Sequence, residues 1–553
     1  MEKFYLGISL GFNSSACVYS SERGLLAAIS QERLNGEKNT KELPFDAMLK
    51  CIELADTCRI DQIAISHYEE ISNEYFERYG EKYKFAVSNW KRTTINYLLS
   101  HGVNVINYDI TRVAHHTAHA LSSFGFYGIP EKNYYTITSD GFGDGLSGQI
   151  KYGHEEVSTI KLRNSIALVY QFVTGALGFK EHQHEGKITG LAAFGEPKYL
   201  SSFENLYMPS MTGNYLEFIA DVWSLTEEEQ QMVERSHIID FDDFLKLKKA
   251  VYSVVNRLIA KGAKREDIAA SVQEFAENHT CDWIRSNCEH LKKADVYLAG
   301  GLFANVKINQ RIKDMRIFKN VYVCPAMGDE GTAVGAAIYL AKEDNVVEDS
   351  KMSERVISGT WVKNPEHGRI LSSEKLIEYI ARNLANDKIV CLKRGRMEFG
   401  PRALCHTSIL YNCDTKETNT WLNEKLGRTE FMPFAPVCRK EVADDLFKNL
   451  DGGRISAKFM TMTFDCTDEF VQNYPAAAHV DNTARPQIVS YEDDPFIWSV
   501  LKRYQELTGK KALINTSFNL HNNPIIENAD VAIDAWKKSD TDVLVIGNVV
   551  FEK

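Results

Sequence analysis

Four residues with metal-binding side chains have spacing and surroundings that suit a single site. His115 and His119 stand four apart in the run HHTAH, so on a helix both rings project from one face and can hold one metal ion. Asp140 follows the β-like run YYTITS and opens the turn GFGDG, while Asp329 stands in a similar turn after VYVCPAM. Two imidazoles and two carboxylates predict a mononuclear metal site.

The metal interpretation depends on the fold, because a histidine pair at helical spacing is common by chance. Both aspartates must come to the pair in space. His116 points elsewhere on the same helix, and we expect it to be structural or to contact a substrate. A metallopeptidase is disfavoured, since the run lacks the glutamate of an HExxH motif.

A second group of chemically active residues lies beside Gly and Pro turns in the C-terminal part of the chain. The planar guanidinium of arginine suits bidentate binding of phosphate or carboxylate. Taken singly, any of these residues could be a surface charge or a turn residue. Together they predict an anion site, drawn from Lys393, Arg394, Arg396, Arg402, Lys425, Arg428, Arg485, Ser517 and Asn519.

The N-terminal part offers further positions for a nucleotide or phosphate. In ADVYLAGGLFANVKIN, a strand leads through Gly300 and Gly301 to a helix that begins near Asn305. Such a corner presents backbone N–H groups to an anion. Lys187 stands between glycines in EGKITG and can meet a phosphate, although a solvated lysine is an equal alternative.

The elements that must position these residues repeat once along the chain. KFYLGISL, SACVYS and GLLAAISQER are three short β-like runs, and YYTITSDGFGDGLSGQIKYG with EVSTIKL repeats the pattern. Two strand meanders, each followed by helices, predict a duplicated α/β domain. A ligand would sit in the cleft between its halves, where Asp140 and Asp329 would come within reach of the histidines.

The chain of 553 residues is too long for one core and predicts at least two domains. A hydrophilic run from KEDNVVEDS to NPEHG reads as the joint between them. We therefore expect a first domain over residues 1–355, a linker over 356–371 and a second α/β domain over 372–553.

Composition is that of a globular enzyme, with 44% hydrophobic and 25% charged residues. A net charge of −11 argues against nonspecific binding of nucleic acid or anionic membranes. The N-terminus does not read as a signal peptide, and no apolar run is long enough to span a bilayer. Eleven cysteines without a CxxC pair favour reduced thiols and a cytoplasmic protein.

In order along nearly the whole chain, these motifs resemble the O-carbamoyltransferases that modify antibiotics and nodulation factors, of which the tobramycin carbamoyltransferase is one. The resemblance rests on HHTAHA, SDGFGDG, EGKITGLAAFG, AGGLFANVKIN, AMGDEGTAVGAA, GRMEFGPRALCHTSIL, MPFAPV, HVDNTARPQIV and INTSFN.

This resemblance implies an α/β protein whose duplicated N-terminal domain has the actin and Hsp70-like ATPase fold. That domain would be similar to the tRNA threonylcarbamoyl-transfer subunit, and the C-terminal domain to YrdC-type carbamoyl-adenylate-forming proteins. Carbamoyl phosphate and ATP would form carbamoyl adenylate in the C-terminal domain. The N-terminal domain would transfer the carbamoyl group to a hydroxyl of a small molecule, such as a sugar, a natural product or a nucleotide.

By the same comparison, His115, His119, Asp140 and Asp329 hold the metal. Fe(II) is the usual ion of the family, although Mn or Zn also suits these ligands. Charge that develops on oxygen needs fixed cations, and Lys187, Arg402, Lys425 and Arg428 are the catalytic candidates. Mg²⁺ as a further ion and a homodimeric assembly are left open.

The chain departs from the family in two places. A His-Asp pair usually follows the first strand, and here Phe12 and Asn13 replace it, neither of which takes a proton at neutral pH. Cys405-His406 stands where a small and a polar residue are usual. We expect the metal to activate the acceptor hydroxyl, assisted by Asp144 as base, with a turn-capping role for Asp144 as the alternative.

A function from another class is kept open. The chain could be a nucleotide-dependent binding or assembly protein of the actin-like fold without transfer chemistry, an alternative that the dense C-terminal anion motifs argue against.

Overall fold

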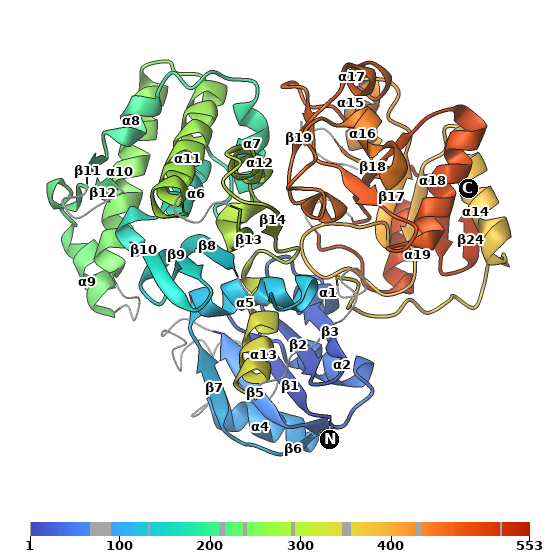
Figure 1. Ribbon diagram of the computed structural model, residues 1–553, viewed down its shortest axis with the longest axis horizontal. Coiled ribbons are helices and arrows are strands. Elements are labelled where there is room, and N and C mark those ends of the chain that lie inside the picture. Colours follow the sequence, from blue (N-terminus) through green and yellow to red (C-terminus); the bar gives the residue numbers. More distant parts are fainter. Residues whose placement is uncertain are drawn as a thin grey trace.

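The computed structural model describes residues 2–66, 90–130, 133–209, 216–235, 240–288, 293–344, 356–425, 434–519 and 523–553. These residues form three lobes (Figure 1). The lower and upper left lobes, blue to green, hold the two sheets that precede residue 345, and the right lobe, orange to red, holds the C-terminal sheet.

The first two sheets share one topology. In each, three antiparallel strands form a meander, and two further strands add in parallel to the first strand of the meander. The first sheet has the order β3 (Gly24–Ser30), β2 (Ser15–Ser20), β1 (Phe4–Ser9), β5 (Gln62–Ser66), β7 (Ile110–Val113). The second has the order β10 (Glu155–Lys161), β9 (Leu146–Tyr152), β8 (Tyr134–Gly143), β13 (Asp295–Ala299), β14 (Val321–Val323). The predicted duplicated domain of the actin and Hsp70-like type is confirmed.

Two helices lie between these sheets, α5 (His115–Tyr127) and α13 (Thr332–Glu343) (Figure 1). They pack closely because α13 is rich in small residues. A Cβ at Gly335 would lie 1.8 Å from the carbonyl oxygen of Ala118, and one at Gly7 would lie 1.9 Å from that of Ala333. Larger residues at these glycines would push α13 away from α5 and β1.

Helices of the second half cover its sheet on the side away from α5. They are α6 (Ile166–Ala176), α7 (Glu185–Ala192), α8 (Leu200–Glu204), α9 (Glu227–Arg235), α10 (Phe241–Ala260), α11 (Arg265–Cys288) and α12 (Val306–Asp314). Helix α11 buries Ile268, Val272 and Phe275. His279 of the same helix packs on Phe275 with ring centroids 4.2 Å apart, which is a structural role.

The first half has shorter helices around its sheet. They are α1 (Glu32–Asn35), α2 (Phe45–Leu54) and α4 (Trp90–Ser100). Phe45, Met48 and Ile52 of α2 pack into the core beneath β2 and β3. This core is separate from the one that lines α5 and α13.

The C-terminal lobe is a second α/β unit built on one eight-stranded mixed sheet. Its strand order is β15 (Arg369–Ile370), β24 (Val549–Glu552), β23 (Val543–Ile546), β16 (Val390–Lys393), β17 (Thr407–Tyr411), β22 (Ala512–Ser517), β18 (Ala435–Arg439), β21 (Gln487–Val489). Helices α14 (Ser373–Ala385) and α18 (Pro495–Thr508) pack against each other, and α19 (Ala529–Lys538) contacts β16 and β23. The prediction of a separate C-terminal α/β unit is confirmed.

The domain boundary differs from the expected one at its far end. Residue 355 lies outside the described residues, but Arg369 and Ile370 form β15 and pair with β24. The expected linker over 356–371 is therefore too long, because part of it belongs to the C-terminal sheet.

The two domains share an extensive contact. The buried Asn309 side chain donates to the carbonyl oxygens of Phe303 and Thr461 at 2.7 Å each, which ties α12 to the C-terminal unit. Aromatic rings also meet across the contact, where Tyr127 lies 5.9 Å from Phe459 between ring centroids. These contacts fix the two domains against each other.

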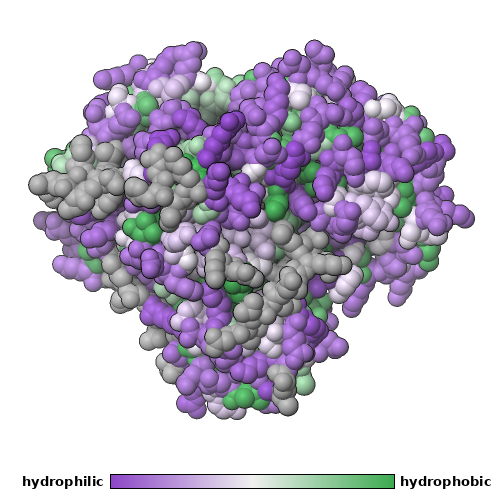
Figure 2. Space-filling model, viewed as in Figure 1, coloured by the Kyte–Doolittle hydropathy of each residue, from purple (hydrophilic) through white to green (hydrophobic). Residues whose placement is uncertain are grey.

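The visible surface is mainly hydrophilic, with hydrophobic residues scattered in small groups (Figure 2). Among the described residues, no helix is long and apolar enough to cross a membrane.

Candidate active site

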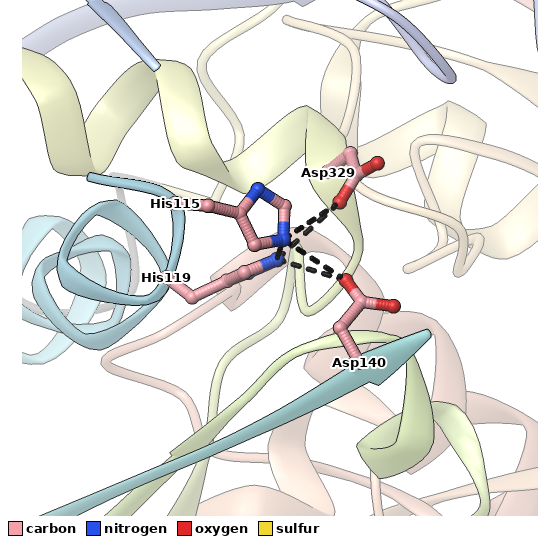
Figure 3. A group of neighbouring side chains, drawn as sticks. All are labelled: His115, His119, Asp140 and Asp329. Carbon is pink, nitrogen blue, oxygen red and sulfur yellow. Dashed lines mark hydrogen bonds and ion pairs between the residues drawn. The ribbon is translucent and has the colours of Figure 1, made fainter. Parts of the chain in front are cut away.

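Three separate segments bring the four predicted metal-binding residues, hereafter the metal-type cluster, together between the lower and the upper left lobes. His115 and His119 lie on the first turns of α5, Asp140 stands near the end of β8, and Asp329 opens the short 3-10 turn η5 (Asp329–Gly331) before α13. Their side chains converge on one point (Figure 3). The duplicated topology explains this, since the β8 and α13 ends meet at the cleft between the halves.

The donor atoms of this cluster have the separations that a metal ion requires. His119 Nε2 lies 3.1 Å from His115 Nε2, 3.0 Å from Asp140 Oδ2 and 3.3 Å from Asp329 Oδ1. His115 Nε2 lies 3.6 Å from Asp140 Oδ2 and 3.8 Å from Asp329 Oδ1. Ligand atoms arranged tetrahedrally at about 2.1 Å from one ion lie about 3.4 Å from each other. The residues therefore fit a divalent metal ion.

The histidines and aspartates of the cluster strongly shift one another's pKa values. Burial lowers the pKa of His119, but the hydrogen bonds to Asp140 and Asp329 outweigh it and raise that pKa to about 9. Burial favours the protonated form of Asp140, yet the two histidines hold its pKa well below the usual range. Two half-buried carboxylates thus favour a positive partner, and a divalent cation would serve in place of a proton.

The neighbours of the two histidines hold them in place. His116 Nδ1 lies 2.9 Å from Thr138 Oγ1, and burial together with the charges of His115 and His119 lowers its pKa to about 3. His116 therefore stays neutral and fixes α5 against β8. This contact favours the structural alternative for His116 over contact with a substrate.

Asp144 lies in the turn between β8 and β9, four residues after Asp140, and has left-handed backbone geometry, with φ of +52°. Its Oδ2 accepts a 2.7 Å hydrogen bond from the backbone N–H of His115. Ala114, the N-cap of α5, provides no side-chain cap, so Asp144 supplies one from this turn. This contact positions the metal-type histidine, and a role for Asp144 as base stays a prediction.

Glycines surround the cluster because the segments approach each other closely. A Cβ at Gly143 would lie 2.2 Å from His115 Cδ2, and one at Gly301 would lie 2.9 Å from Asp140 Oδ1. The backbone N–H of Gly300, which we expected to face a nucleotide, donates to the carbonyl oxygen of Met327 at 2.8 Å. Gly300 thus joins the Asp140 and Asp329 segments, and the anion-binding role expected for the glycine pair stays a prediction.

Asn305 is likewise part of the scaffold. Its side-chain oxygen accepts from the backbone N–H groups of Lys307 and Ile308 and caps α12. Its amide nitrogen donates to Gln273 Oε1 at 2.9 Å. With both polar ends used, Asn305 is unavailable to a nucleotide in this arrangement.

A cavity of about 250 Å³ lies between the two domains. Residues of α7, α11 and α12 line one side, and Thr463, Asp481 and Arg485 of the C-terminal domain line the other. At its edge, Lys307 Nζ forms a 2.7 Å ion pair with Asp481 Oδ2 across the domain boundary. Of the predicted anion-binding residues, Arg485 thus lines a cavity that both domains form.

Arg402 crosses the same boundary from the GPRAL loop. Its Nη2 donates to the carbonyl oxygen of Ala304 at 3.3 Å, and its buried Nε has no partner among the described residues. Burial lowers the pKa of Arg402 and that of Arg485, and the charge of Arg485 lowers that of Arg402 further. Two neighbouring guanidinium groups that destabilise each other favour a bound anion.

The charge of Glu330 acts on Arg402 and raises its pKa, against the effects of burial and of Arg485. Burial raises the pKa of Glu330 to about 7, and Asn13 Nδ2 donates to its Oε2 at 3.4 Å. Because Glu330 follows Asp329 in the chain, Arg402 interacts with the segment that carries one of the four metal-type residues.

Lys393 ends β16 beneath the same loop. Its side chain is buried, its ammonium makes no hydrogen bond or ion pair within the described chain, and burial lowers its pKa to about 8. Glu398 raises that pKa from nearby and accepts from the backbone N–H groups of Leu404 and Thr407 at 2.7 and 3.1 Å. A buried, unpaired lysine is suited to an anionic ligand.

Other predicted residues lie elsewhere. The guanidinium of Arg396 donates to the carbonyl oxygens of Leu26, Ser358 and Gly359, so it joins the domains, and its expected role as a phosphate ligand stays a prediction. Lys425 contacts the carbonyl oxygen of Asp540 and the ring of Trp421, away from the other candidates. Arg428 lies outside the described residues.

Three candidates keep an open assignment. Lys187 is half-buried in α7, and its ammonium has no ion-pair partner among the described residues. Ser517 Oγ donates to Asn519 Oδ1 at 2.7 Å at the end of β22, while Asn519 Nδ2 donates to the Asn523 carbonyl oxygen. These residues remain predicted ligands. The sequence analysis missed His182, in the EHQHEGK segment that we read for Lys187 alone.

A duplicated α/β domain with a metal-type cluster in its cleft, joined through an arginine-bearing cavity to a second α/β domain, defines a two-domain enzyme. The family model for the carbamoyltransferase N-terminus matches residues 5–338, and that for the carbamoyltransferase C-terminus matches residues 381–553. The chain therefore belongs to the carbamoyltransferase family and is a carbamoyltransferase. The predicted resemblance is confirmed.

Relatives extend over the whole chain. An uncharacterized protein of Methanocaldococcus jannaschii is 28% identical over 99% of each chain. Nodulation protein NolNO of Sinorhizobium fredii is 26% identical over 98% of this chain and 79% of its own, and nodulation protein U of Rhizobium tropici is 32% identical over 44% and 41%.

Solved structures resemble the chain more distantly. HypF in its phosphate- and nucleotide-bound form is 16% identical, with a TM-score of 0.30, over 62% of this chain and 55% of its own. Component A of the Acidaminococcus fermentans (R)-2-hydroxyglutaryl-CoA dehydratase is 11% identical, with a TM-score of 0.34, over 62% and 99%. Scores this low are no basis for inference.

Proposed function

We propose that the protein is an ATP-dependent O-carbamoyltransferase that works through carbamoyl adenylate. In the C-terminal domain, carbamoyl phosphate loses phosphate to water, and the resulting carbamate oxygen bonds to the α-phosphorus of ATP as pyrophosphate leaves. In the N-terminal domain, an acceptor hydroxyl oxygen bonds to the carbamoyl carbon. The bond from that carbon to the adenylate oxygen breaks, AMP leaves with the electron pair, and the hydroxyl proton is released.

One observation carries this proposal: Arg402 of the C-terminal domain crosses the domain boundary, and the charge of Glu330, the residue that follows Asp329, acts on it there. Arg402 donates a hydrogen bond to the carbonyl oxygen of Ala304. The charge of Arg485 lowers its pKa, and the charge of Glu330 raises it. An adenylate phosphate held between the two arginines would therefore lie between the two reaction centres.

Each group then has a chemical role. Arg402 and Arg485 hold the phosphate and favour the charge that develops on the leaving AMP oxygen. Lys393 supplies a further cation in the C-terminal domain. His115, His119, Asp140 and Asp329 would hold the divalent ion, Fe(II) by the family resemblance, which supplies Lewis-acid polarisation of the carbamoyl carbonyl.

The proposal is tested on the full chain with ATP and carbamoyl phosphate. Pyrophosphate release reports the first half-reaction, and mass spectrometry for the gain of one carbamoyl group across a panel of small hydroxylated metabolites reports the second. We expect the native protein to perform both. Native protein that releases no pyrophosphate when both substrates are supplied would contradict the adenylate route.

Substitution of the two histidines of the metal-type cluster should affect the two half-reactions differently. The double variant with His115→Ala and His119→Ala should lose its metal and carbamoyl transfer but keep most pyrophosphate release, because the two centres lie in different domains. Full metal content in the double variant would remove the histidines from the site.

The arginine pair gives a second test. Arg402→Ala should slow pyrophosphate release by about tenfold or more, since charged hydrogen bonds contribute roughly 1.5–3 kcal/mol. Arg454→Ala is the matched control, because that arginine pairs with Asp444 and Asp451 on the exposed surface. Equal rates in the two variants would show that Arg402 is no substrate ligand.

A further inference from the structure

His182 adopts backbone geometry that side chains rarely take, in the loop between α6 and α7. Its φ is +64°. Three contacts hold it there: its backbone N–H donates to Glu185 Oε1 at 2.6 Å, its carbonyl oxygen accepts from Asn39 Nδ2 at 3.3 Å, and its ring bonds Gln171. Such strained, over-determined residues gather at functional sites.

The imidazole of His182 crosses the cleft of the duplicated domain. It stacks on the ring of Phe12 with centroids 4.4 Å apart and planes inclined by 18°. Phe12 belongs to the β1–β2 loop of the first half, whereas His182 belongs to the second half. Lys41 Nζ lies 3.6 Å from the Phe12 ring centroid, so a cation completes the stack.

This ring pair lies beside the metal-type cluster. Asn13, next to Phe12, donates to Glu330, and Glu330 follows Asp329 in the chain. The charges of Asp140 and Asp329 both act on the His182 imidazole. His182 therefore lies on the side of the second half that faces the Phe12–Asn13 loop and the segment of Asp329.

Hydrogen bonds fix which ring nitrogen of His182 carries the proton. Gln171 Nε2 lies 3.3 Å from Glu181 Oε2, and a carboxylate accepts only, so this amide atom is the NH₂ nitrogen. The same nitrogen lies 3.1 Å from His182 Nε2, which must then accept. The proton of the neutral ring is therefore on Nδ1.

Neighbouring groups keep this ring neutral and still. Desolvation and the charge of Lys41 lower the pKa of His182, against the opposing charges of Glu181, Asp140 and Asp329. Glu181 itself is anchored, since its carboxylate accepts from Tyr252 Oη at 2.6 Å and pairs with Lys248 Nζ at 3.0 Å on α10. Among the described residues, Nδ1 of His182 has no hydrogen-bond partner.

We propose that His182 binds the acceptor substrate, donating its Nδ1–H to an oxygen of the acceptor and so orienting the attacking hydroxyl. This inference rests on the proposed transfer function. His182 keeps its proton throughout. The acceptor oxygen bonds to the carbamoyl carbon, AMP leaves with the electron pair, and the hydroxyl proton ends on the AMP phosphate or in solvent. The acceptor class is thus a polar molecule with an oxygen beside its reacting hydroxyl.

The test compares variants of the full-length, metal-loaded protein supplied with ATP and carbamoyl phosphate, with glycerol in excess as the probe acceptor. AMP formed per pyrophosphate released measures transfer. His182→Phe keeps the stack on Phe12 without the N–H and should lower this ratio about five- to tenfold, the effect of one lost hydrogen bond. His182→Asn tolerates the left-handed geometry, restores an N–H donor and should stay close to native.

Gln183→Ala is the matched control, because this neighbouring side chain is exposed, and it should behave as native. An unchanged ratio in His182→Phe would overturn the proposal. So would a loss of pyrophosphate release that matches the loss of AMP, since that would show a merely structural role.

A second measurement does not depend on turnover. Long-range proton–nitrogen spectra of the ¹⁵N-histidine-labelled protein, assigned by difference from His182→Asn, should show His182 neutral with its proton on Nδ1. A proton on Nε2 would overturn the proposal. Native protein without pyrophosphate release would instead contradict the proposed function, and the spectra would then decide on His182.

Discussion

Lys393 should set the pH range of the first half-reaction. Burial lowers its pKa to about 8, compared with an ordinary value of about 10.4. Its ammonium, which we propose as an anion ligand, is present below about pH 8 and lost above it. Pyrophosphate release should therefore fall as pH rises through about 8. Lys393→Arg should keep its charge and move this decline upward, as a pH profile would show.

Deprotonation of Lys393 does not lower pyrophosphate release by unfolding the protein. Between about pH 8 and 10.4 the unfolded chain binds the Lys393 proton and the folded chain does not, so the free energy of unfolding from this group rises with pH. A thermal unfolding curve at each pH is the control. Coincident profiles for native protein and Lys393→Arg would assign the decline to another group.

Two substitutions at Asp144 distinguish a positioning role from a role as the general base. Because it accepts from the backbone N–H of His115, Asp144→Ala should weaken metal binding about 10- to 100-fold. Asp144→Asn keeps an oxygen acceptor and should retain both metal and near-native transfer. If Asp144 is the base, the Asn variant should instead bind metal normally and transfer at least about 100-fold more slowly. Metal content and transfer rate measured together separate these outcomes.

At the scale of elements, the metal-type cluster depends on how closely the β8–β9 hairpin approaches the start of α5. Adding one methyl at Gly143 would place Cβ 2.2 Å from His115 Cδ2, so the ring must move away from His119 and the aspartates. Gly143→Ala should therefore reduce metal content strongly while the secondary structure seen by circular dichroism persists.

Gly186→Ala is the matched control for that change. A Cβ at Gly186 meets nothing within 4 Å, and alanine favours its helix α7 by roughly 0.5–1 kcal/mol. We expect full metal content in this variant. Full metal content in Gly143→Ala as well would mean that the hairpin and α5 can separate without loss of the site.

At the scale of the whole molecule, the domain contact should contribute measurably to stability. Asn309 donates to carbonyl oxygens on both sides of the boundary, and its side chain is completely buried. Asn309→Ala leaves both acceptors without this donor and should lower the free energy of unfolding by about 1–3 kcal/mol. Denaturant unfolding of the full chain measures this.

Lys307→Ala provides the comparison at the same boundary. The Lys307–Asp481 pair is partly exposed, so its loss should cost no more than about 1 kcal/mol. A larger loss in Lys307→Ala than in Asn309→Ala would show that the ion pair, rather than the buried amide, holds the domains together.

The sequence by itself determined the local features of this protein. Apolar runs such as YYTITS and GLLAAIS contain enough β-branched and aromatic residues to define strands, and the turn glycines define their ends. The repeat of one meander predicted the duplicated domain, and the helical spacing of His115 and His119 predicted that both would face one ion. These are periodic signals that a short window carries.

Tertiary structure decided which polar groups remain available for chemistry. Arg396 and Arg402 stand six residues apart in one basic run, but their contacts differ. Arg396 donates hydrogen bonds to three carbonyl oxygens at the domain contact. Arg402 reaches the carbonyl oxygen of Ala304 across the domain boundary, and its buried Nε has no hydrogen-bond partner among the described residues. The sequence did not indicate His182 as a candidate because its partners Phe12 and Asn39 come from distant segments. Hydrogen-bond partners are set by contacts between remote parts of the chain, and no local spacing encodes them.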